Sequence, residues 1–350
     1  MKSFKIGSRE IGSGHAPFII AEMSGNHNQS LDRALEIVDA AAKAGAHAIK
    51  LQTYTADTMT LNVDKDDFKI LDKNSLWHGR HLYELYQEAY TPWEWHKPIM
   101  ELAKSLGVLC FSTPFDETAV DFLEELEVPC YKIASFENTD VRLIKKVAAT
   151  GKPVIISTGM ASLEELELMV KTLRANHCEN FILLKCTSAY PALPSDANLK
   201  TIPHMAEMFN CQVGLSDHTM GIGVPLAAVA LGASVIEKHF CLSRAEGGVD
   251  SAFSLEPFEL KLLVEESERA WQSLGKVKYQ TSAVEEKSKQ FRRSVYISKD
   301  IKAGEVITEA HIRCVRPGYG LEPKYFEKLI GKAVKEDLLS GDRMTWEVLV

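Results

Sequence analysis

Residues 214–240, GLSDHTMGIGVPLAAVALGASVIEKHF, indicate the fold of the chain. The stretch begins with Gly-Leu-Ser-Asp-His at the end of one apolar run and closes with Glu-Lys-His at the end of another. A glycine-rich turn and an Ala/Val/Leu segment of helical length lie between the two runs. This order predicts a strand, a helix and a second strand parallel to the first, with polar residues where each strand ends.

His218 and His239 follow these two strands. Either histidine alone is more often a packed residue. Because parallel neighbouring strands lie about 4.8 Å apart and end at the same edge, we expect the two imidazoles to share a metal ion. Two imidazoles fall short of a closed zinc site, so an open divalent site such as manganese fits better. Asp217 is a candidate to orient His218.

The composition is that of a globular protein with an acidic balance. The 350 residues are 45% hydrophobic and 25% charged, and the net charge of −8 argues against a nucleic-acid-binding protein. The longest mainly apolar run, residues 224–236, is too short to span a membrane, and the N-terminus has no signal-peptide core. Seven cysteines without a C-x-x-C pair are typical of reduced thiols in the cytoplasm.

Short apolar runs alternate with amphipathic stretches as far as residue 275. We expect strands at 16–21, 46–51, 108–111, 130–133, 154–156, 181–185, 212–215 and 234–236. Eight strand–helix units of this total length predict a (β/α)₈ TIM barrel. An open doubly wound sheet is the alternative, but it has fewer strands, and no G-x-G-x-x-G follows the first strand.

Two segments depart from this alternation. Residues 53–80 have no helical period and form a long insertion after the second strand, where long ordered loops are usually functional. Residues 1–275 have a net charge of −12 and residues 276–350 a net charge of +4. We therefore expect a barrel domain over 1–275, a polar linker over 276–290 and a small β-rich domain over 291–350, packed on the barrel or on a partner chain.

Active sites of TIM barrels lie at the carboxyl ends of the strands. At these ends the sequence places groups that bond, ionise or ligate: Glu22, Lys50, Gln52, Thr113, Lys132, Ser135, Ser157, Ser188, Tyr190, Ser216, His218, Glu237 and His239. Each residue alone is a weak signal. Together they predict one polar active site in the mouth of the barrel.

Lys50 and Lys132 follow apolar strand residues, so each needs an anion or a shifted pKa. Three interpretations stay open: a clamp for a phosphate and a carboxylate, ion pairs with Glu22 or Glu237, and a Schiff-base nucleophile. The strand-end hydroxyl groups favour the anion clamp, because serines beside helix N-termini bind phosphate well.

The loop after the first strand carries further candidates. Glu22 is suited to orient or deprotonate an attacking water, with a salt bridge as its structural alternative. Asn26 and His27 are suited to bond sugar hydroxyl groups, although His27 is equally suited to packing. His47 lies inside an apolar run and is expected in the core.

The strings IAEMSGNH, AIKLQTY, FSTPFD, YKIASFE, ISTGMAS, KCTSAYP, GLSDHT and EKHF resemble the sialic-acid-synthase family across the whole barrel. The tail, SKDIKAGEVITEAHI and VRPGYGL, is similar to the antifreeze-like (SAF) domain of that family. Residues 53–96 most resemble its pseudaminic acid synthase branch. The resemblance implies condensation of phosphoenolpyruvate with 2,4-diacetamido-2,4,6-trideoxy-L-altrose, giving pseudaminic acid and phosphate by C–O cleavage. Synthesis of N-acetylneuraminic or legionaminic acid is the alternative.

The resemblance also implies roles for individual residues. It assigns phosphoenolpyruvate to Lys50, Thr113, Lys132, Ser135, Ser157, Ser188 and Ser216. It assigns the acylated aminosugar to Gln52, Glu137, Tyr190 and Asp250, and to Arg316 of the other subunit of a domain-swapped homodimer. His218 and His239 would hold a divalent ion, manganese or else magnesium or cobalt, and Glu22 would act on water or on the condensing carbons. Family members often have Asn in place of Ser188, which implies a shorter or a water-mediated phosphate contact here.

Overall fold

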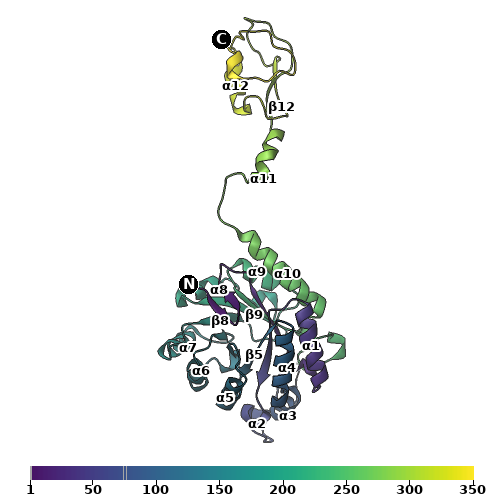
Figure 1. Ribbon diagram of the computed structural model, residues 1–350, viewed down its shortest axis with the longest axis vertical. Coiled ribbons are helices and arrows are strands. Elements are labelled where there is room, and N and C mark those ends of the chain that lie inside the picture. Colours follow the sequence, from purple (N-terminus) through teal and green to yellow (C-terminus); the bar gives the residue numbers. More distant parts are fainter. Residues whose placement is uncertain (1, 74, 76) are drawn as a thin grey trace. The chain divides into compact units, whose positions relative to one another are not determined.

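The computed structural model describes residues 2–73, 75 and 77–350 (Figure 1). The chain divides into two compact units, residues 1–275 and residues 276–350. The division lies where the net charge of the sequence changes sign.

The first unit contains a closed, parallel, eight-stranded barrel, which confirms the predicted TIM barrel. Its strands are β3 (Phe18–Glu22), β4 (Ala48–Thr53), β5 (Leu109–Pro114), β6 (Tyr131–Ile133), β7 (Val154–Ser157), β8 (Phe181–Cys186), β9 (Gln212–Asp217) and β10 (Val235–His239). The barrel closes where β10 pairs with β3. All eight predicted strands are found, and several continue further than expected into the polar residues at their ends.

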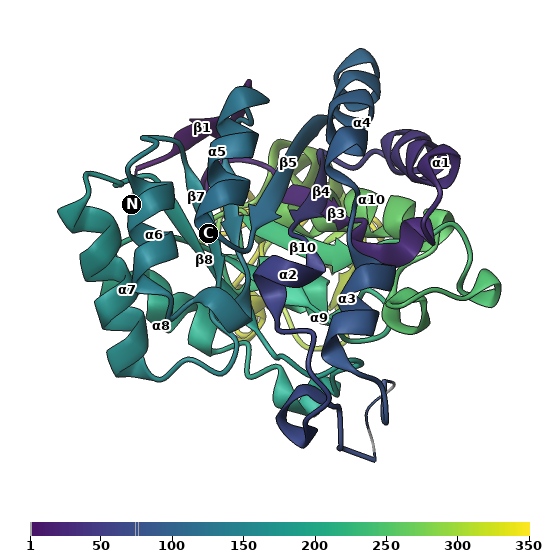
Figure 2. The same cartoon turned by 90° about the horizontal axis from the view of Figure 1, so that it is seen from below.

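Helices surround the barrel, as Figure 2 shows with the strands at the centre. They are α1 (Leu31–Lys43), α4 (Trp93–Ser105), α5 (Glu117–Glu125), α6 (Val141–Ala148), α7 (Leu163–Ala175), α8 (Thr201–Phe209), α9 (Gly223–Ala230) and α10 (Pro257–Leu274). Polar caps fix several starts: the side chain of Ser30 accepts from the Arg33 amide, and Ser162 forms a capping box with Glu165.

A hairpin that the sequence did not indicate lies at the amino ends of the barrel strands. Strands β1 (Phe4–Ile6) and β2 (Arg9–Ile11) pair antiparallel, and Ile6 and Ile11 are buried in the barrel core. The side chain of Gln212, the first residue of β9, donates to the carbonyl of Lys2 at 3.0 Å. The hairpin therefore covers the end of the barrel opposite the carboxyl strand ends.

The insertion after β4 is more ordered than its sequence suggests. It contains the short helix α2 (Ala56–Met59) and a 3₁₀ turn at Asp66–Phe68, and it leads into α3 (Leu82–Ala89). Between the 3₁₀ turn and α3 the chain reverses direction, and the Ile70 amide donates to the Arg80 carbonyl at 3.0 Å. The segment was predicted as non-helical, and the single turn of α2 is too short to give a periodic signal.

The second unit has a core of its own around Val295, Ile312, Val334 and Met344. Its strands β11 (Ser294–Ile297) and β12 (Ile312–Val315) pair antiparallel, and α12 spans Phe326–Leu329. The segment predicted as a linker contains α11 (Ala283–Glu286), which a capping box from Ser282 stabilises. Within the described part of the chain, every helix is too short or too polar to cross a membrane.

Candidate active site

The carboxyl ends of the barrel strands surround a cavity of about 380 Å³, a volume typical of small-molecule sites. Thirteen of the sixteen predicted site residues line it: Glu22, Lys50, Gln52, Lys132, Ser135, Glu137, Ser157, Ser188, Tyr190, Ser216, His218, His239 and Asp250. They lie on, or shortly after, every strand except β5. Closure of the sheet therefore gathers side chains that are far apart in the sequence.

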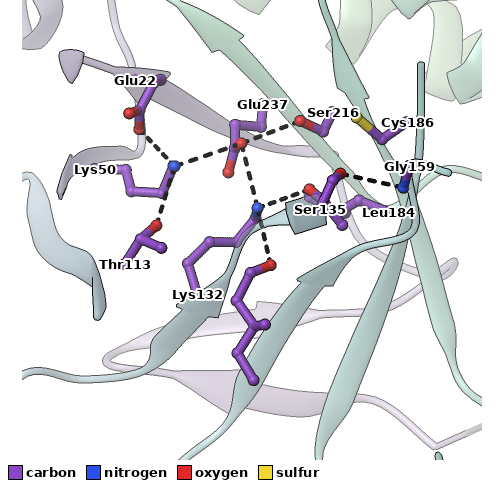
Figure 3. A network of polar contacts seen from close by, with 12 residues as sticks. Glu22, Lys50, Thr113, Lys132, Ser135, Gly159, Leu184, Cys186, Ser216 and Glu237 are labelled. Carbon is purple, nitrogen blue, oxygen red and sulfur yellow. Dashed lines mark hydrogen bonds and ion pairs between the residues drawn. The ribbon is translucent and has the colours of Figure 1, made fainter. Parts of the chain in front are cut away.

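Two lysines and two glutamates form a buried network at the base of this cavity (Figure 3). Strand register places Glu22 of β3 beside Lys50 of β4, and Lys50 Nζ lies 2.7 Å from Glu22 Oε2. Glu237 Oε1 lies 3.6 Å from Lys50 Nζ and also 3.6 Å from Lys132 Nζ. The ion-pair interpretation of both lysines therefore holds in the free cavity, with Glu237 shared between them.

The two lysines are compensated unequally. Burial would lower the pKa of Lys50, but Glu22 and Glu237 outweigh it and raise that pKa. Burial lowers the pKa of Lys132, and the shared Glu237 raises that pKa by less than burial lowers it. Burial would raise the pKa of Glu237, but the two lysines hold it below its usual value. Lys132 thus has the most to gain from an additional anion.

Hydroxyl groups lie around Lys132. Its ammonium donates to Ser157 Oγ at 2.7 Å, and the Gly159 amide donates to Ser135 Oγ at 3.1 Å. A Cβ on Gly159 would lie 2.1 Å from Ser188 Oγ and 2.6 Å from Ser135 Oγ, so only glycine fits between these hydroxyl groups. The result is a compact arrangement of donors beside an under-compensated cation, which suits a phosphate group.

The predicted proximity of the two histidines is confirmed, since the ring centroids of His218 and His239 lie 5.4 Å apart. His218 Nδ1 lies 2.9 Å from the Thr187 carbonyl, and this contact fixes a proton on Nδ1. Nε2, the other ring nitrogen, therefore points away from that carbonyl. Burial and the positive groups nearby hold the pKa of His239 well below its usual value, so its imidazole is neutral. Its buried Nδ1 has no hydrogen-bond partner among the described residues.

These properties fit a divalent ion with open coordination positions. No group of three or more His, Cys, Asp or Glu side chains in the described chain is arranged to hold a metal, so water and substrate would complete the shell. Asp217 does not orient His218 as predicted. Its carboxylate instead lies 2.7 Å from Nζ of Lys238, which is on the neighbouring strand, and both side chains are buried.

The remaining polar groups line the side of the cavity. Gln52 Nε2 donates to Glu22 Oε1 at 2.8 Å and to Ser24 Oγ at 3.0 Å. Ser24 donates in turn to the Asp250 carboxylate. Burial raises the pKa of Glu137 to about 7, even though Lys132 opposes the shift. This side therefore offers carboxyl and amide groups that are suited to sugar hydroxyl and acylamino groups.

Comparison with known proteins identifies the family to which the chain belongs. The NeuB family profile matches residues 37–279, and the SAF domain profile matches residues 292–350. The chain belongs to the NeuB family.

Its relatives in the NeuB family include synthases of several nonulosonic acids. Pseudaminic acid synthase of Campylobacter jejuni is 48% identical over 93% of this chain and 95% of the relative. N,N'-diacetyllegionaminic acid synthase of Legionella pneumophila is 38% identical over 97% of each chain. The crystal structure of N-acetylneuraminic acid (sialic acid) synthetase from Leptospira borgpetersenii in complex with citrate is 34% identical, with a TM-score of 0.73, over 82% of this chain and 95% of that one.

Two predicted site residues of the first unit do not line the cavity. Asn26 turns back into the core from the 3₁₀ turn after β3 and donates to the Phe240 carbonyl and to Ser254 Oγ, both at 2.9 Å. Its amide nitrogen is therefore engaged in packing. Thr113 Oγ1 accepts a hydrogen bond from Lys50 Nζ at 3.3 Å and so helps to hold the ammonium group of that lysine in place. Arg316 belongs to the second unit, and its role toward the sugar stays a prediction.

His47, which was predicted in the core, packs there, and His27, which was left open between a sugar contact and packing, also packs. His27 is buried, contacts Thr91 Oγ1 at 3.2 Å and meets Trp95 edge-on. His47 accepts from the Ile19 amide at 2.8 Å at the base of the barrel.

Sequence reasoning gave two features too little weight. Glu237 was predicted at the barrel mouth as a salt-bridge candidate for one lysine, whereas it lies beside both lysines. Its position in Glu-Lys-His at a strand end was the available signal. The apolar side of the cavity, which residues 53–90 provide, was not predicted, because apolar residues in a non-periodic segment have no distinguishing pattern.

Proposed function

We propose that the protein is a transferase that condenses phosphoenolpyruvate with 2,4-diacetamido-2,4,6-trideoxy-L-altrose, giving pseudaminic acid and phosphate. The observation that carries this proposal is the unequal compensation of Lys50 and Lys132 in one cavity, beside a pair of histidines. The 48% identity to a pseudaminic acid synthase over nearly the whole chain supports the choice of sugar.

Each end of phosphoenolpyruvate has a suitable partner. Lys132 and the hydroxyl groups of Ser135 and Ser188 bind the phosphate, and Lys50 binds the carboxylate. An arriving anion replaces part of the carboxylate contact that each lysine has in the free cavity. Because these partners are buried and preorganised, they hold the methylene carbon of phosphoenolpyruvate in a fixed position.

His218 and His239 would hold a divalent ion, which we propose to be Mn²⁺, with Mg²⁺ or Co²⁺ as alternatives. When bound, the ion would polarise the sugar aldehyde. The neutral imidazole of His239 is available as a ligand without loss of a proton. At His218, Cys186 and the Thr187 carbonyl outweigh the effect of burial and raise the pKa, so binding there is coupled to proton release.

Bond formation joins the methylene carbon of phosphoenolpyruvate to the aldehyde carbon and leaves positive charge at the enol carbon. Water adds to that carbon, and the tetrahedral product releases phosphate by breaking the C–O bond. Burial and the nearby Glu237 raise the pKa of Glu22, while Lys50 opposes them. A carboxylate with a raised pKa is a better proton acceptor, so Glu22 takes the proton of the attacking water.

A phosphate-release assay over a panel of sugars tests the proposal. We expect turnover with the diacetamido altrose sugar and little with N-acetylmannosamine or the sugar precursor of legionaminic acid. Preference for the legionaminic precursor would favour the function of the 38% identical relative instead.

A Schiff-base mechanism is the second candidate, because the lowered pKa of Lys132 also suits a nucleophile. Borohydride added during turnover distinguishes the two mechanisms. We expect no covalent adduct on Lys132, and we expect a chelator to abolish turnover. A trapped adduct together with metal-independent activity would replace the proposed mechanism.

We also propose a domain-swapped homodimer that works in the cytoplasm. Apolar side chains are exposed on successive loops at the mouth of the barrel, at Phe136, Met160, Leu193 and Met220. An apolar rim of this kind favours cover by a partner, and the partner's Arg316 would then meet the sugar. All seven cysteines are free, which fits a reducing compartment. Sedimentation analysis tests the dimer, and a monomer at micromolar concentration would contradict it.

A further inference from the structure

The cavity has two unlike sides. We call the buried strand-end residues Glu22, Lys50, Lys132, His218, Glu237 and His239 the floor. We call the apolar residues Met59, Ile70, Trp77, Leu82 and Leu85 the wall. All wall residues come from the insertion after β4 and from α3, and none comes from a barrel strand.

Trp77 holds a defined place in the wall. Its indole Nε1 donates to the Val249 carbonyl at 3.2 Å, which joins the insertion to the loop after β10. Its ring lies 6.1 Å from that of Tyr190, and the Tyr190 ring lies 4.3 Å from that of His218. A path from the histidines along the cavity therefore passes Tyr190 and then reaches Trp77.

The rest of the wall is packed against the barrel. Leu85 is buried, and Tyr54, which lines the same cavity, meets Tyr86 at 5.8 Å and Phe115 at 5.1 Å between ring centroids. Ile70 is fixed by backbone hydrogen bonds in both directions, to the Arg80 carbonyl and from the Gly79 amide. The wall is thus a built surface that can select a ligand by shape and polarity.

We propose that the wall makes the enzyme selective for a sugar whose far end is apolar, with Trp77 and Ile70 as the specificity-determining residues. This inference rests on the proposed function, because that function puts the aldehyde carbon at the histidines. A six-carbon chain that starts there and runs over Tyr190 brings its C6 methyl and the 4-acetamido methyl to the wall.

A hydroxyl group at C6 would be disfavoured at this position. The Trp77 N–H is already donated to Val249, and Ile70 offers no polar side-chain atom. A hydroxyl group that loses water without gaining a partner binds less well than a methyl group of similar size. An apolar pocket discriminates by about 10- to 100-fold in such cases, so we expect that preference for the 6-deoxy sugar over its 6-hydroxy analogue.

Two substitutions test the wall, with a matched control. Trp77→Ala removes the ring, and Ile70→Thr replaces the γ-methylene group by a hydroxyl group and removes the terminal methyl group. Leu61→Thr is the control, because Leu61 lies in the same insertion, is 62% exposed and does not line the cavity. The readouts are kcat/KM for phosphate release with the 6-deoxy and 6-hydroxy sugars, and the KM for phosphoenolpyruvate.

We expect each wall variant to lose about ten-fold in preference through a higher KM for the 6-deoxy sugar, with the KM for phosphoenolpyruvate unchanged. The control should keep the wild-type preference. If Trp77→Ala does not fold, Ile70→Thr carries the test. Wild-type preference in both folded wall variants would overturn the inference.

Failure of the proposed function is separable from failure of this inference. If the wild type releases no phosphate with either sugar, the proposed function fails, and calorimetric affinities of the two sugars then test the wall directly. Tighter binding of the 6-deoxy sugar that weakens in Ile70→Thr would support the wall. Equal affinities for the two sugars in the wild type would overturn it.

Discussion

The floor and the wall of the cavity differ in chemistry and in origin. The floor consists of charged and imidazole side chains on barrel strands, each buried to at least 91%. The wall consists of apolar side chains on an inserted segment, most of them only half-buried. Closure of the barrel fixes the floor, whereas the insertion can change without disturbing a strand. The barrel frame therefore supplies the chemistry, and a separate segment supplies the selectivity.

The two sides should also differ in what a substitution costs. A buried charge that loses its partner is strongly destabilising, whereas a half-buried apolar side chain loses only part of its burial energy. Substitutions in the floor should therefore affect both catalysis and folding. Substitutions in the wall should affect mainly the affinity for the sugar.

The largest expected effect comes from Lys132→Met in the floor. It removes the under-compensated cation that we assign to the phosphate, so kcat/KM should fall by about 10³-fold. Lys185→Met is the matched control, since Lys185 also lies near the end of a barrel strand but does not line the cavity. A Lys132→Met enzyme that keeps a tenth of the wild-type activity would contradict the assignment of the floor.

The next effect concerns the frame that holds the histidines. Lys238→Met leaves the buried Asp217 without its cationic partner, and we expect the free energy of unfolding to fall by about 3–5 kcal/mol. Urea denaturation measures the change. Adding Asp217→Leu should recover much of the loss. Lys43→Met, which breaks an exposed pair with Asp39, should change stability by less than about 0.5 kcal/mol.

A pH-dependent effect is expected at the edge of the floor. Burial raises the pKa of Glu137 to about 7 in the folded state, so the stability from this group is present at low pH and is lost as the pH rises toward 7. Glu137→Gln lacks this loss and should be more stable than the wild type at pH 8, by about 3 kcal/mol at most. The gain should vanish near pH 4. Equal thermal stability of the two proteins at both pH values would show that Glu137 titrates normally.

The smallest effect is expected in the wall away from Trp77. Leu82→Ala should raise the KM for the sugar by about three- to ten-fold and leave the KM for phosphoenolpyruvate unchanged, because it removes apolar contact without touching the floor. Tyr83→Phe on the same helix is the control, since Tyr83 bonds Asp57 and does not line the cavity. A parallel rise in both KM values would contradict the separate roles of floor and wall.

The difference between the two sides also accounts for what the sequence could predict. Lys50, Lys132 and the histidines were predictable, because polar residues at the carboxyl ends of buried strands face the active site of a TIM barrel. The shared role of Glu237 depends on which strands become neighbours when the sheet closes, and no local pattern encodes that. The wall was missed for a different reason, since Ile70 and Trp77 look like ordinary packing residues until a cavity is seen beside them.

Two other misses have local causes. The strands of the β1–β2 hairpin have three residues each, too few for an alternating pattern to be recognised. Asn26 was predicted as a ligand from its place after a strand. A single 3₁₀ turn directs its side chain to the Phe240 carbonyl instead, and sequence position alone does not determine that direction.

The most direct test of the central claim is ³¹P NMR of the phosphate formed from phosphoenolpyruvate in H₂¹⁸O with the diacetamido altrose sugar. Condensation at the floor followed by C–O cleavage predicts phosphate that forms only when the sugar is present and carries no ¹⁸O from the solvent. Phosphate that contains solvent ¹⁸O, or that forms at the same rate without the sugar, would contradict the account.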